Sequence, residues 1–539
     1  MKDRRVEQRR TQIVNSKSRH AFIRHLSPAL RYKRVILIAV MSLSMLTAVN
    51  QTYTQSTAPA LDTKCNCDVV FNSLISKVED NYVGYHLAVR GKRDAEYKRY
   101  AEEFRQRALN SSPENCVFVL QDFVRFFRDG HMFINESPRL SDEDAARLVR
   151  TAEQITRRED DIRSYLDANS KDLDPIEGIW YAKEGYRIGI IRDYKANRRD
   201  FVAIMLSSGV ERWTPGQVKA EFRKLRDGSY SVVFYSGRHY PLHPAVYLRG
   251  QEGGAAIRRG ILLHMPPITW GKAYPLKPDE QGVLDPADPR RPTIRSLGES
   301  TMVVSVPSHS PEYAPILNEL VERFRERILS AENLIIDIRG DEGGSSWMTR
   351  ALMPFIVTKS KRPGRPDGKP VVVSSSDNIA YFEQMTSQGW VPKHLVERMK
   401  ENLGKVIPFD DPESTDSAKE PTANDTATPR PRNVAILMDG AVVSAGEAFV
   451  PEAMKNEKVT LFGKHTGGCI DYQNVTIVGV RGCPSLGINL GYPILAASDH
   501  LPVGGVNPTG IAPDVSIGRV VRDPIRFIIN YYSRNKKSE

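Results

Sequence analysis

The C-terminal half of the chain alternates buried strands with amphipathic helices, and this alternation constrains the fold more than any other feature. Three successive stretches predict a strand, a helix and a strand: STMVVSVP (300–307), PEYAPILNELVERFRERIL (311–329) and NLIIDIRG (333–340). The same order recurs between residues 434 and 464. Because such a unit joins parallel strands through a right-handed crossover, residues 299–539 predict an α/β core with a parallel sheet.

Two loops of this core carry glycine and serine directly after a predicted strand. They are DIRGDEGGSS, with Gly343 and Gly344, and DGAVVSAGE, with Ser444. Open α/β sheets place their sites at the carboxyl ends of strands, so we expect the two loops to meet there. Ser444 is also expected to be a helix N-cap, with Glu447 completing a capping box. Free amides at that helix start and a close glycine backbone predict an oxyanion hole beside a nucleophile.

Four further regions surround or interrupt the core. Residues 60–170 have helical periodicity, and their stretch 141–166 is expected to be one solvated helix. Residues 175–266 are short apolar runs between turn residues and predict a β-rich module, followed by a proline-rich connector at 267–298. Residues 409–432 have almost no apolar content and predict a flexible insertion.

The N-terminal segment accounts for most of the net charge. Residues 1–34 contain eleven Lys or Arg and two acidic residues, a net +9 of the total +11, which leaves +2 for the remainder. Because the residues after 34 carry almost no net charge, no nucleic-acid partner is predicted. The fifteen uncharged residues 35–49 match a signal-peptide h-region and are short for a membrane span of about 20 residues. We therefore predict a periplasmic or extracellular protein that contacts the membrane only through this segment, as a cleaved signal or an uncleaved anchor.

The five cysteines predict a disulfide framework in an oxidising compartment. Cys469 and Cys483 are expected to pair, and Cys116 is expected to pair with Cys65 or Cys67, which leaves one cysteine over. The Cys-x-Cys spacing of Cys65 and Cys67 lacks the Cys-x-x-Cys pattern of a structural zinc site. No metal site is predicted.

Four motifs follow one another in the core: LIIDIRGDEGG, VSAGEAF, LFGKHTGG and GIAPDV. In this combination residues from about Thr301 to Gly518 resemble the C-terminal-processing (tail-specific) serine peptidases, a superfamily that includes the tricorn core protease and the modules of interphotoreceptor retinoid-binding protein. The resemblance implies a crotonase-like α/β core with Ser444 as nucleophile. It also implies that the amides of Ala445 and of Gly343 or Gly344 form the oxyanion hole.

The resemblance also nominates the group that activates the serine. The bacterial processing branch uses a lysine about twenty-five residues after the serine, where this chain has Cys469, which cannot replace it. The tricorn-like branch instead takes a histidine from the N-terminal helical region, and RDGHMF nominates His131 as general base. His465 and His309 are the alternatives.

Two departures from the family pattern bear on activity. The tricorn-like branch supplies an acid near the final turn, where VNPTGIAPD has Asn507, an amide that can orient an imidazole but carries no charge. Glu447 is expected to be structural. No loop resembling the carboxylate-binding loop of a PDZ domain precedes the core, and the β-rich module occupies that place, so strict tail specificity is not predicted.

The sequence therefore predicts an exported serine endopeptidase or carboxy-terminal peptidase that acts on proteins or peptides through an acyl-enzyme and needs no cofactor. The alternative is a non-catalytic binding protein on the same fold, taking a peptide or a hydrophobic ligand. The physiological substrate and the oligomeric state cannot be inferred from these residues.

Overall fold

The computed structural model describes residues 65–535 except 194–198, 245–253, 359–367, 390, 410–427 and 519–520. The predicted leader at 35–49, the predicted strand AVYLRG at 245–250 and most of the insertion at 409–432 lie outside these residues. The described residues all fall in one compact unit. Within them, no helix has both the length and the apolar character that a membrane span requires.

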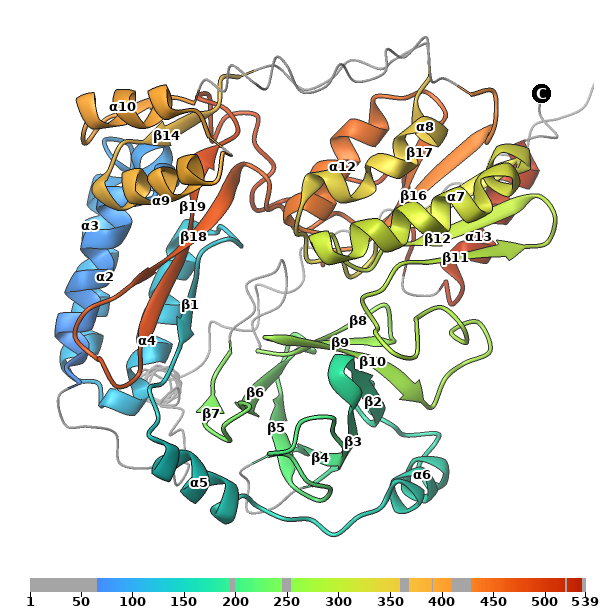
Figure 1. The fold of residues 1–539 in the computed structure, drawn as a ribbon, viewed down its shortest axis with the longest axis horizontal. Coiled ribbons are helices and arrows are strands. Elements are labelled where there is room, and N and C mark those ends of the chain that lie inside the picture. The colour runs from blue at the N-terminus through green and yellow to red at the C-terminus, as the bar shows by residue number, and fades with distance from the viewer. Residues whose placement is uncertain are drawn as a thin grey trace, which may run out of the picture. The chain divides into compact units, whose positions relative to one another are not determined.

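The predicted parallel core is a six-stranded sheet (Figure 1). Its strands, in spatial order, are β11 (Thr293–Leu297), β12 (Thr301–Ser305), β13 (Asn333–Asp337), β16 (Asn433–Met438), β17 (Val459–Gly463) and β20 (Val515–Ser516). Only β11 is antiparallel to its neighbour, and every other pairing is parallel. The α/β prediction is therefore confirmed.

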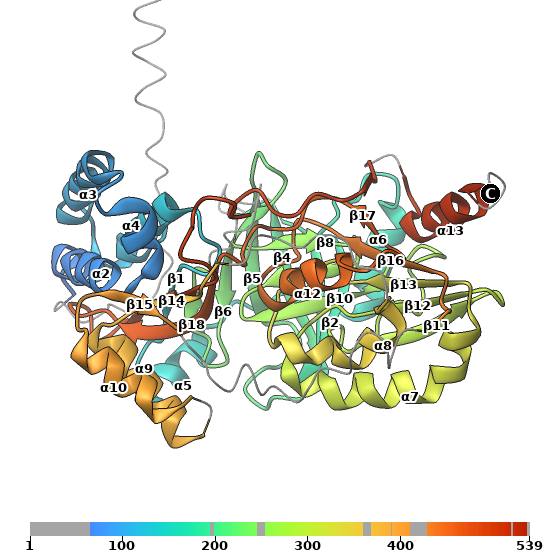
Figure 2. The ribbon, with the colours of Figure 1, turned by 90° about the horizontal axis from the view of Figure 1, so that it is seen from above.

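Helices cover both faces of this sheet, which explains why its strands are apolar throughout. Ile336 and Ile436 pack against α7 (Ala314–Ser330) and α12 (Ser444–Met454), together with α8 (Met353–Ile356). The alternate residues Ile335 and Leu437 pack against α13 (Pro524–Asn535) on the opposite face. Figure 2 shows α7 and α13 on opposite sides of these strands.

The β-rich region forms a nine-stranded antiparallel sheet. In chain order its strands are β2 (Gly178–Ala182), β3 (Tyr186–Arg192), β4 (Phe201–Ser207), β5 (Val218–Lys224), β6 (Tyr230–Tyr235), β7 (Pro241–Leu242), β8 (Ala256–Arg258), β9 (Leu262–Met265) and β10 (Ile268–Tyr274). β10 lies in the stretch predicted as a connector, and it pairs with β2 and β9. Its Trp270 is fully buried in the core of this sheet, which outweighs the local proline content.

A third sheet combines distant parts of the sequence. It contains β1 (Phe133–Glu136), β14 (Val371–Val373), β15 (Val406–Pro408), β18 (Tyr472–Gly479) and β19 (Ile488–Ala496). It shares one hydrophobic core with α2 (Cys67–Asn81), α3 (Asp94–Leu109), α4 (Cys116–Val124), α9 (Ser376–Ser387) and α10 (Lys393–Glu401). In Figure 1 the N-terminal helices lie beside the late strands β18 and β19.

The helix predicted over 141–166 is wrong as a single element. The structure has α5 (Asp142–Thr151) and α6 (Glu159–Ala168), separated by an extended segment. Gln154 in that segment forms a bridge with Gln217, and the Ile155 amide donates to the Gly216 carbonyl. Backbone pairing with the nine-stranded sheet therefore replaces helical hydrogen bonds at this point.

The disulfides differ in part from the predicted pairing. Cys67 bonds Cys116, one of the two expected alternatives, whereas Cys65 bonds Cys483 and the buried Cys469 is free. The Cys469–Cys483 prediction is wrong because the β18–β19 turn carries Cys483 to the start of α2, where the Asn66 amide donates to the Gly482 carbonyl. Sequence proximity was a poor guide to spatial proximity here.

Peptide mapping without reduction should recover Cys65 linked to Cys483 and Cys67 linked to Cys116. Cys469 should be alkylated only after denaturation, because it is buried. Cys483→Ser should lower the free energy of unfolding by about 2–5 kcal/mol, since the bond closes a long loop. Recovery of a Cys469–Cys483 peptide from native protein would contradict the structure.

Candidate active site

Ser444 lies where the carboxyl ends of three parallel strands meet. It begins α12 directly after β16, half-buried, with a backbone φ of 54°. A non-glycine residue in this left-handed region is strained, and such strain concentrates at functional sites. The loops after β13 and β17 border the same edge of the sheet.

The glycine loop after β13 packs directly on Ser444. A Cβ atom on Gly343, whose φ is 88°, would lie 2.5 Å from the Ser444 Cβ and 3.0 Å from the Ala445 nitrogen. Only a glycine permits this approach. The two loops that the sequence predicted to meet are therefore in contact.

The predicted oxyanion amides are not equivalent. The Gly343 amide already donates to Asp341 Oδ1 at 2.9 Å, so it is not free for a ligand. The Gly344 amide makes no hydrogen bond within the described residues, and the Ala445 amide lies in the first turn of α12, where no intrahelical acceptor exists. Of the three amides, those of Gly344 and Ala445 are therefore free for a ligand among the described residues.

The predicted capping box is absent. Val443, not Ser444, is the N-cap residue of α12, and no side chain caps this helix. Glu447 is fully buried and instead accepts hydrogen bonds from the Thr466 hydroxyl and from the amides of Gly468 and Cys469. Its carboxylate therefore holds the loop after β17 against α12, a structural role.

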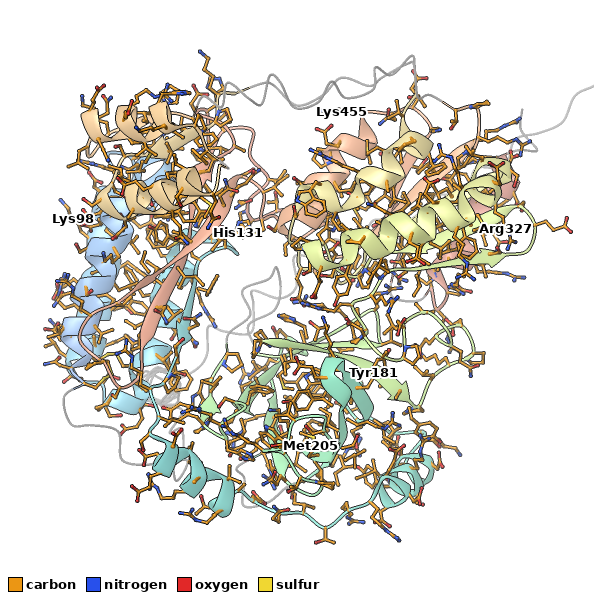
Figure 3. All side chains as sticks on the ribbon, viewed as in Figure 1. Lys98, His131, Tyr181, Met205, Arg327 and Lys455 are labelled. Atoms are coloured by element: carbon orange, nitrogen blue, oxygen red, sulfur yellow. A yellow bond between two sulfur atoms is a disulfide. The ribbon has the colours of Figure 1, made fainter. Side chains whose placement is uncertain are left out.

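His131 lies between α4 and β1 (Figure 3), and its ring is held in a defined orientation. Its Nδ1 lies 2.7 Å from the Tyr472 carbonyl oxygen, an acceptor, so Nδ1 carries the proton. Nε2 is buried and has no hydrogen-bond partner among the described residues. In its neutral form the ring would therefore have an open lone pair on Nε2, which is what a general base requires.

Two further groups lie beside this imidazole. Asp129 Oδ1 lies 4.0 Å from His131 Nδ1 and accepts the His131 amide, while Asp129 Oδ2 accepts the Tyr82 hydroxyl. Ligand atoms of Asp129, His131 and the Cys469 thiol all lie within 4.8 Å of one another. Burial, followed by the Asp129 and Glu447 charges, raises the pKa of the Cys469 thiol well above its usual value, while a backbone hydrogen bond from Ser444 opposes this rise. Cys469 is therefore close both to the Ser444 backbone and to His131.

Asn507 does not orient His131 in this structure, contrary to the prediction. Its Oδ1 accepts the amides of Ile470 and Asp471 at 3.1 and 3.2 Å. These amides precede Tyr472, the residue that does hold the imidazole, so Asn507 acts on the ring only through the backbone. The tricorn-like pattern of an acid at this position has no counterpart here, and Asp129 supplies the nearby carboxylate.

The two alternative histidines differ in position. His309 follows β12, is fully buried, and bonds Asp341 Oδ2 through Nδ1, while its Nε2 is unpartnered. A Cβ on Gly446 would lie 2.8 Å from Asp341 Cγ, so this pair packs beneath α12. His465 is exposed and makes no hydrogen bond through its ring within the described residues. His309 is therefore buried beside α12, whereas the His465 ring is exposed.

A cavity of about 450 Å³ opens next to the catalytic candidates. Its lining includes Gly130 and Val443, the immediate neighbours of His131 and Ser444, as well as Phe133 of β1. Arg258 and Pro266 of the nine-stranded sheet region complete another wall. Its volume lies within the range of ligand-binding clefts.

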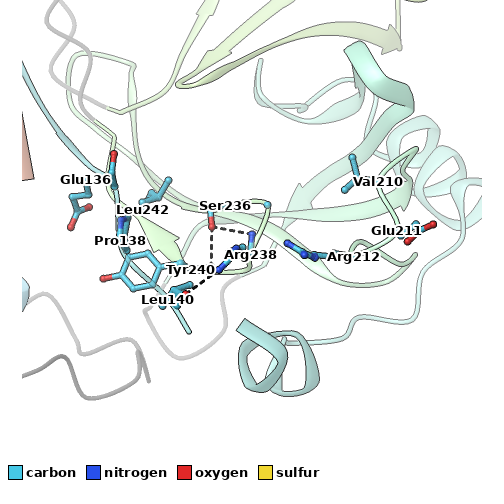
Figure 4. Close-up of a pocket in the computed structure, with 12 residues that line it drawn as sticks. Glu136, Pro138, Leu140, Val210, Glu211, Arg212, Ser236, Arg238, Tyr240 and Leu242 are labelled. Atoms are coloured by element: carbon cyan, nitrogen blue, oxygen red, sulfur yellow. Dashed lines mark hydrogen bonds between the residues drawn. The ribbon is translucent and has the colours of Figure 1, made fainter. Parts of the chain in front are cut away.

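A second cavity of about 640 Å³ shares Glu136 and Leu242 with the first (Figure 4). Tyr240 and Arg238, from the β6–β7 hairpin, line it, but none of the catalytic candidates does. Burial raises the pKa of Glu136, on the shared wall, to about 7. This cavity is therefore separate from the reacting groups.

The nine-stranded sheet holds the glycine loop through an ion pair between the buried Arg258 and the partly exposed Glu342. Arg258 Nη1 lies 2.8 Å from Glu342 Oε1, and His264 bonds the same oxygen. Burial alone would raise the pKa of the Glu342 carboxyl, yet the His264 and Arg258 charges hold it at about 2. Because Glu342 precedes Gly343, this clamp fixes the loop that packs on Ser444.

A second buried pair anchors the start of the same loop. Arg259 Nη2 lies 2.7 Å from Asp337 Oδ2, and its Nη1 lies 3.0 Å from the Ser305 hydroxyl. Burial would raise the pKa of Asp337, but Arg259 and Arg339 lower it to about 2. Both ends of the loop are therefore tied to adjacent arginines of the nine-stranded sheet region.

Sequence reasoning missed Asp129, Tyr472 and Glu342. Asp129 was visible as the acid two residues before His131 in RDGHMF, and the acid-x-His spacing could have nominated it. Tyr472 contributes only a carbonyl, which no residue type signals. Glu342 stood inside the recognised loop, but its partners come from a different sheet.

Gly343→Ala should slow acylation of Ser444 on the order of 100-fold, because the new methyl group displaces the serine. Gly228→Ala is the matched control, since Gly228 has the same φ of 88° with no atom within 4 Å of its Cβ position. Both changes carry the strain of a left-handed alanine, but only the first should affect acylation. Equal effects of the two changes on acylation would refute the proposed contact.

Arg258→Met should lower the free energy of unfolding by about 3 kcal/mol, because it leaves Glu342 without its buried cation. Thermal or urea unfolding measures this loss, and a double-mutant cycle with Glu342→Gln isolates the coupling. Arg238→Met, which breaks an exposed pair with Asp142, should cost less than about 1 kcal/mol. Similar losses in the free energy of unfolding for Arg258→Met and Arg238→Met would argue against a strong Arg258–Glu342 ion pair.

Residues 301–517 match the family model described as peptidase family S41. No curated protein matches the chain significantly. Similar solved structures include mature CPAF complexed with lactacystin (12% identity, 88% of this chain and 98% of that chain, TM-score 0.39) and the photosystem II D1 C-terminal processing protease (12%, 86% and 94%, TM-score 0.31). The tricorn protease is similar at 13% identity over 87% of this chain and 37% of that chain, with a TM-score of 0.35.

Peptidase family S41 is identified by the family match and by the motifs that lie within it. That match covers both loops of the site, including Gly343 and Ser444. Residues 301–517 therefore belong to peptidase family S41, the C-terminal-processing superfamily of serine-type peptidases.

Proposed function

We propose that this protein hydrolyses peptide bonds with Ser444 as nucleophile and His131 as general base. The amides of Gly344 and Ala445 bind the oxyanion. The observation that carries the proposal is the state of His131: Nδ1 is tied to the Tyr472 carbonyl, and the lone pair of Nε2 is left open. The strained backbone of Ser444 beside the glycine loop supports the nucleophile assignment.

The mechanism requires proton transfers that these groups can make. Ser444 Oγ attacks the scissile carbonyl carbon while its proton passes to His131 Nε2. The carbonyl oxygen becomes an oxyanion held by the two amides, and its collapse expels the amine, which takes the proton from Nε2. Water then attacks the acyl-enzyme in the same way and releases the carboxylic acid and free Ser444.

Asp129 supports His131 as a charge and as a backbone anchor. Its carboxylate lies 4.0 Å from Nδ1 and holds the His131 amide. A carboxylate at this distance stabilises the imidazolium that forms when Ser444 loses its proton. Asp129 is therefore proposed to replace the acid that the tricorn-like pattern places at Asn507.

The substrate is proposed to be a protein or peptide bound in the 450 Å³ cavity, cleaved either internally or near its C-terminus. The six-stranded sheet with α7 and α12 would be the crotonase-like core, and the nine-stranded sheet the inserted domain in place of PDZ. With its ion pairs Arg258–Glu342 and Arg259–Asp337, that domain is suited to hold the glycine loop rather than to capture a terminal carboxylate.

Export is proposed from two independent features. The basic segment 1–34 and the uncharged run 35–49 form a leader pattern. The bonds Cys65–Cys483 and Cys67–Cys116 are expected in an oxidising compartment such as the periplasm or the extracellular space.

A non-catalytic binding protein is the second candidate. One observation favours it: the Ser444 hydroxyl makes no hydrogen bond to an imidazole within the described residues. Catalytic hydrogen bonds are often long in the absence of substrate and tighten only in the complex, so this observation does not outweigh the site geometry.

The test is active-site labelling of the purified protein by a fluorophosphonate, together with hydrolysis of a peptide library. Ser444→Ala should abolish labelling, and His131→Ala should slow both reactions by about 10²–10⁴-fold. His465→Ala, an exposed histidine outside the site, should leave both unchanged. Labelling that is unaffected by His131→Ala would reject His131 as base. Absence of both labelling and hydrolysis in the parent would favour the binding protein.

Asp129→Asn should lower kcat/KM about tenfold or more and move the ascending limb of its pH profile to lower pH. The sign follows because a negative neighbour favours the imidazolium, so its removal lets the base lose its proton at lower pH. Asn507→Ala should leave the position of that limb unchanged, since Asn507 does not contact the ring. If the ascending limb of the pH profile moves with Asn507→Ala and not with Asp129→Asn, then Asn507, and not Asp129, is the residue that supports His131.

A further inference from the structure

We propose that Asp129, His131 and Cys469 together bind one zinc ion, and that the bound ion reversibly blocks the general base. All three residues are buried, and their ligand atoms lie within 4.8 Å of one another. Carboxylate, imidazole and thiolate are the three ligand types that zinc takes in proteins. Asp129 and His131 precede β1 and Cys469 precedes β18, so only the fold brings the three ligands together.

The spacing of the three groups is close to that of a zinc site. Zn–N and Zn–O bonds of about 2.0 Å and a Zn–S bond of about 2.3 Å place tetrahedral ligands about 3.3–3.6 Å apart. Closing a cluster whose atoms already lie within 4.8 Å therefore needs side-chain shifts on the order of 1 Å. Three protein ligands leave the fourth position for water, as in an open site.

The groups around the ligands already have the arrangement expected of outer-shell partners. The His131 ring donates through Nδ1 to the Tyr472 carbonyl, and Asp129 Oδ2 accepts the Tyr82 hydroxyl at 2.8 Å. Metal-bound histidine and carboxylate groups usually have such partners, which fix their orientation. The Cys469 backbone is held by Glu447. These hydrogen bonds fix the orientation of the three ligand residues and leave His131 Nε2 open.

The local charge also favours a dication. The charges that act on the Cys469 thiol come from the carboxylates of Asp129, Glu447 and Asp471. A zinc ion replaces the thiol proton, which leaves to solvent, and its two positive charges offset the thiolate and the nearby carboxylates. The 450 Å³ cavity is lined by Gly130, the residue between Asp129 and His131, so it lies beside the cluster.

Bound zinc would remove the base whichever ring nitrogen it takes. Coordination by Nε2 occupies the lone pair that accepts the Ser444 proton, and coordination by Nδ1 moves the ring proton to Nε2. This inhibitory consequence rests on the proposed function, whereas zinc binding itself does not.

The test measures the absorption spectrum of bound Co²⁺ and the affinity for Zn²⁺ by calorimetry, both on the disulfide-intact protein. One equivalent of Co²⁺ should give a thiolate-to-metal absorption band that Zn²⁺ displaces, with proton release. Cys469→Ser should remove that band and weaken Zn²⁺ binding at least tenfold. The matched control is His465→Ala, on the exposed part of the same loop, which should change neither. An unchanged band or affinity in Cys469→Ser would overturn the site.

Activity measurements separate this proposal from the proposed function. Zinc should inhibit peptide hydrolysis with the affinity found by calorimetry, and a chelator should restore the rate. Stoichiometric zinc binding to a protein that neither hydrolyses peptides nor reacts with a fluorophosphonate would support the metal site and reject the peptidase. Binding at Cys469 with unchanged hydrolysis would overturn the inhibitory role.

Discussion

The contact between Gly343 and Ser444 is the constraint on which the rest of the site depends. The left-handed backbone of Ser444 turns the chain from β16 into α12, and the glycine loop after β13 closes over it with no room for a side chain. Because β13 and β16 are adjacent parallel strands, their loops leave the sheet at the same edge. The contact places the backbone of the glycine loop against Ser444 and the start of α12, where the Ala445 amide has no intrahelical acceptor.

The surrounding sheets each support one part of this contact. The nine-stranded sheet holds the glycine loop through the buried Arg258 and Arg259, whose carboxylate partners stay ionised over the physiological pH range. The five-stranded sheet supplies His131 at the start of β1 and its carbonyl partner at the start of β18. Catalysis would therefore depend on the correct placement of all three sheets. The Cys65–Cys483 bond links the N-terminal helices to the β18–β19 turn.

Local patterns in the sequence predicted the parallel core and its two loops, because strand, helix and glycine signals act over a few residues. The same patterns failed where a distant partner decided the outcome. Glu447 has the right spacing for a capping box, but its carboxylate is taken by the loop at 466–469. Cys483 is close to Cys469 in sequence, but the β18–β19 hairpin carries it to Cys65. The residue that holds His131 does so through a backbone carbonyl, which has no sequence signature. The cluster of Asp129, His131 and Cys469 could not be predicted from local patterns either, because its members lie up to 340 positions apart in the sequence.

The most direct test of the central claim is a crystal structure of the fluorophosphonate adduct of Ser444. The account predicts a phosphoryl oxygen about 2.7–3.1 Å from the amides of Gly344 and Ala445, with His131 Nε2 in hydrogen-bond reach of the serine oxygen. An adduct in which His309 is the nearest imidazole to that oxygen, or in which the oxygen binds neither amide, would contradict it.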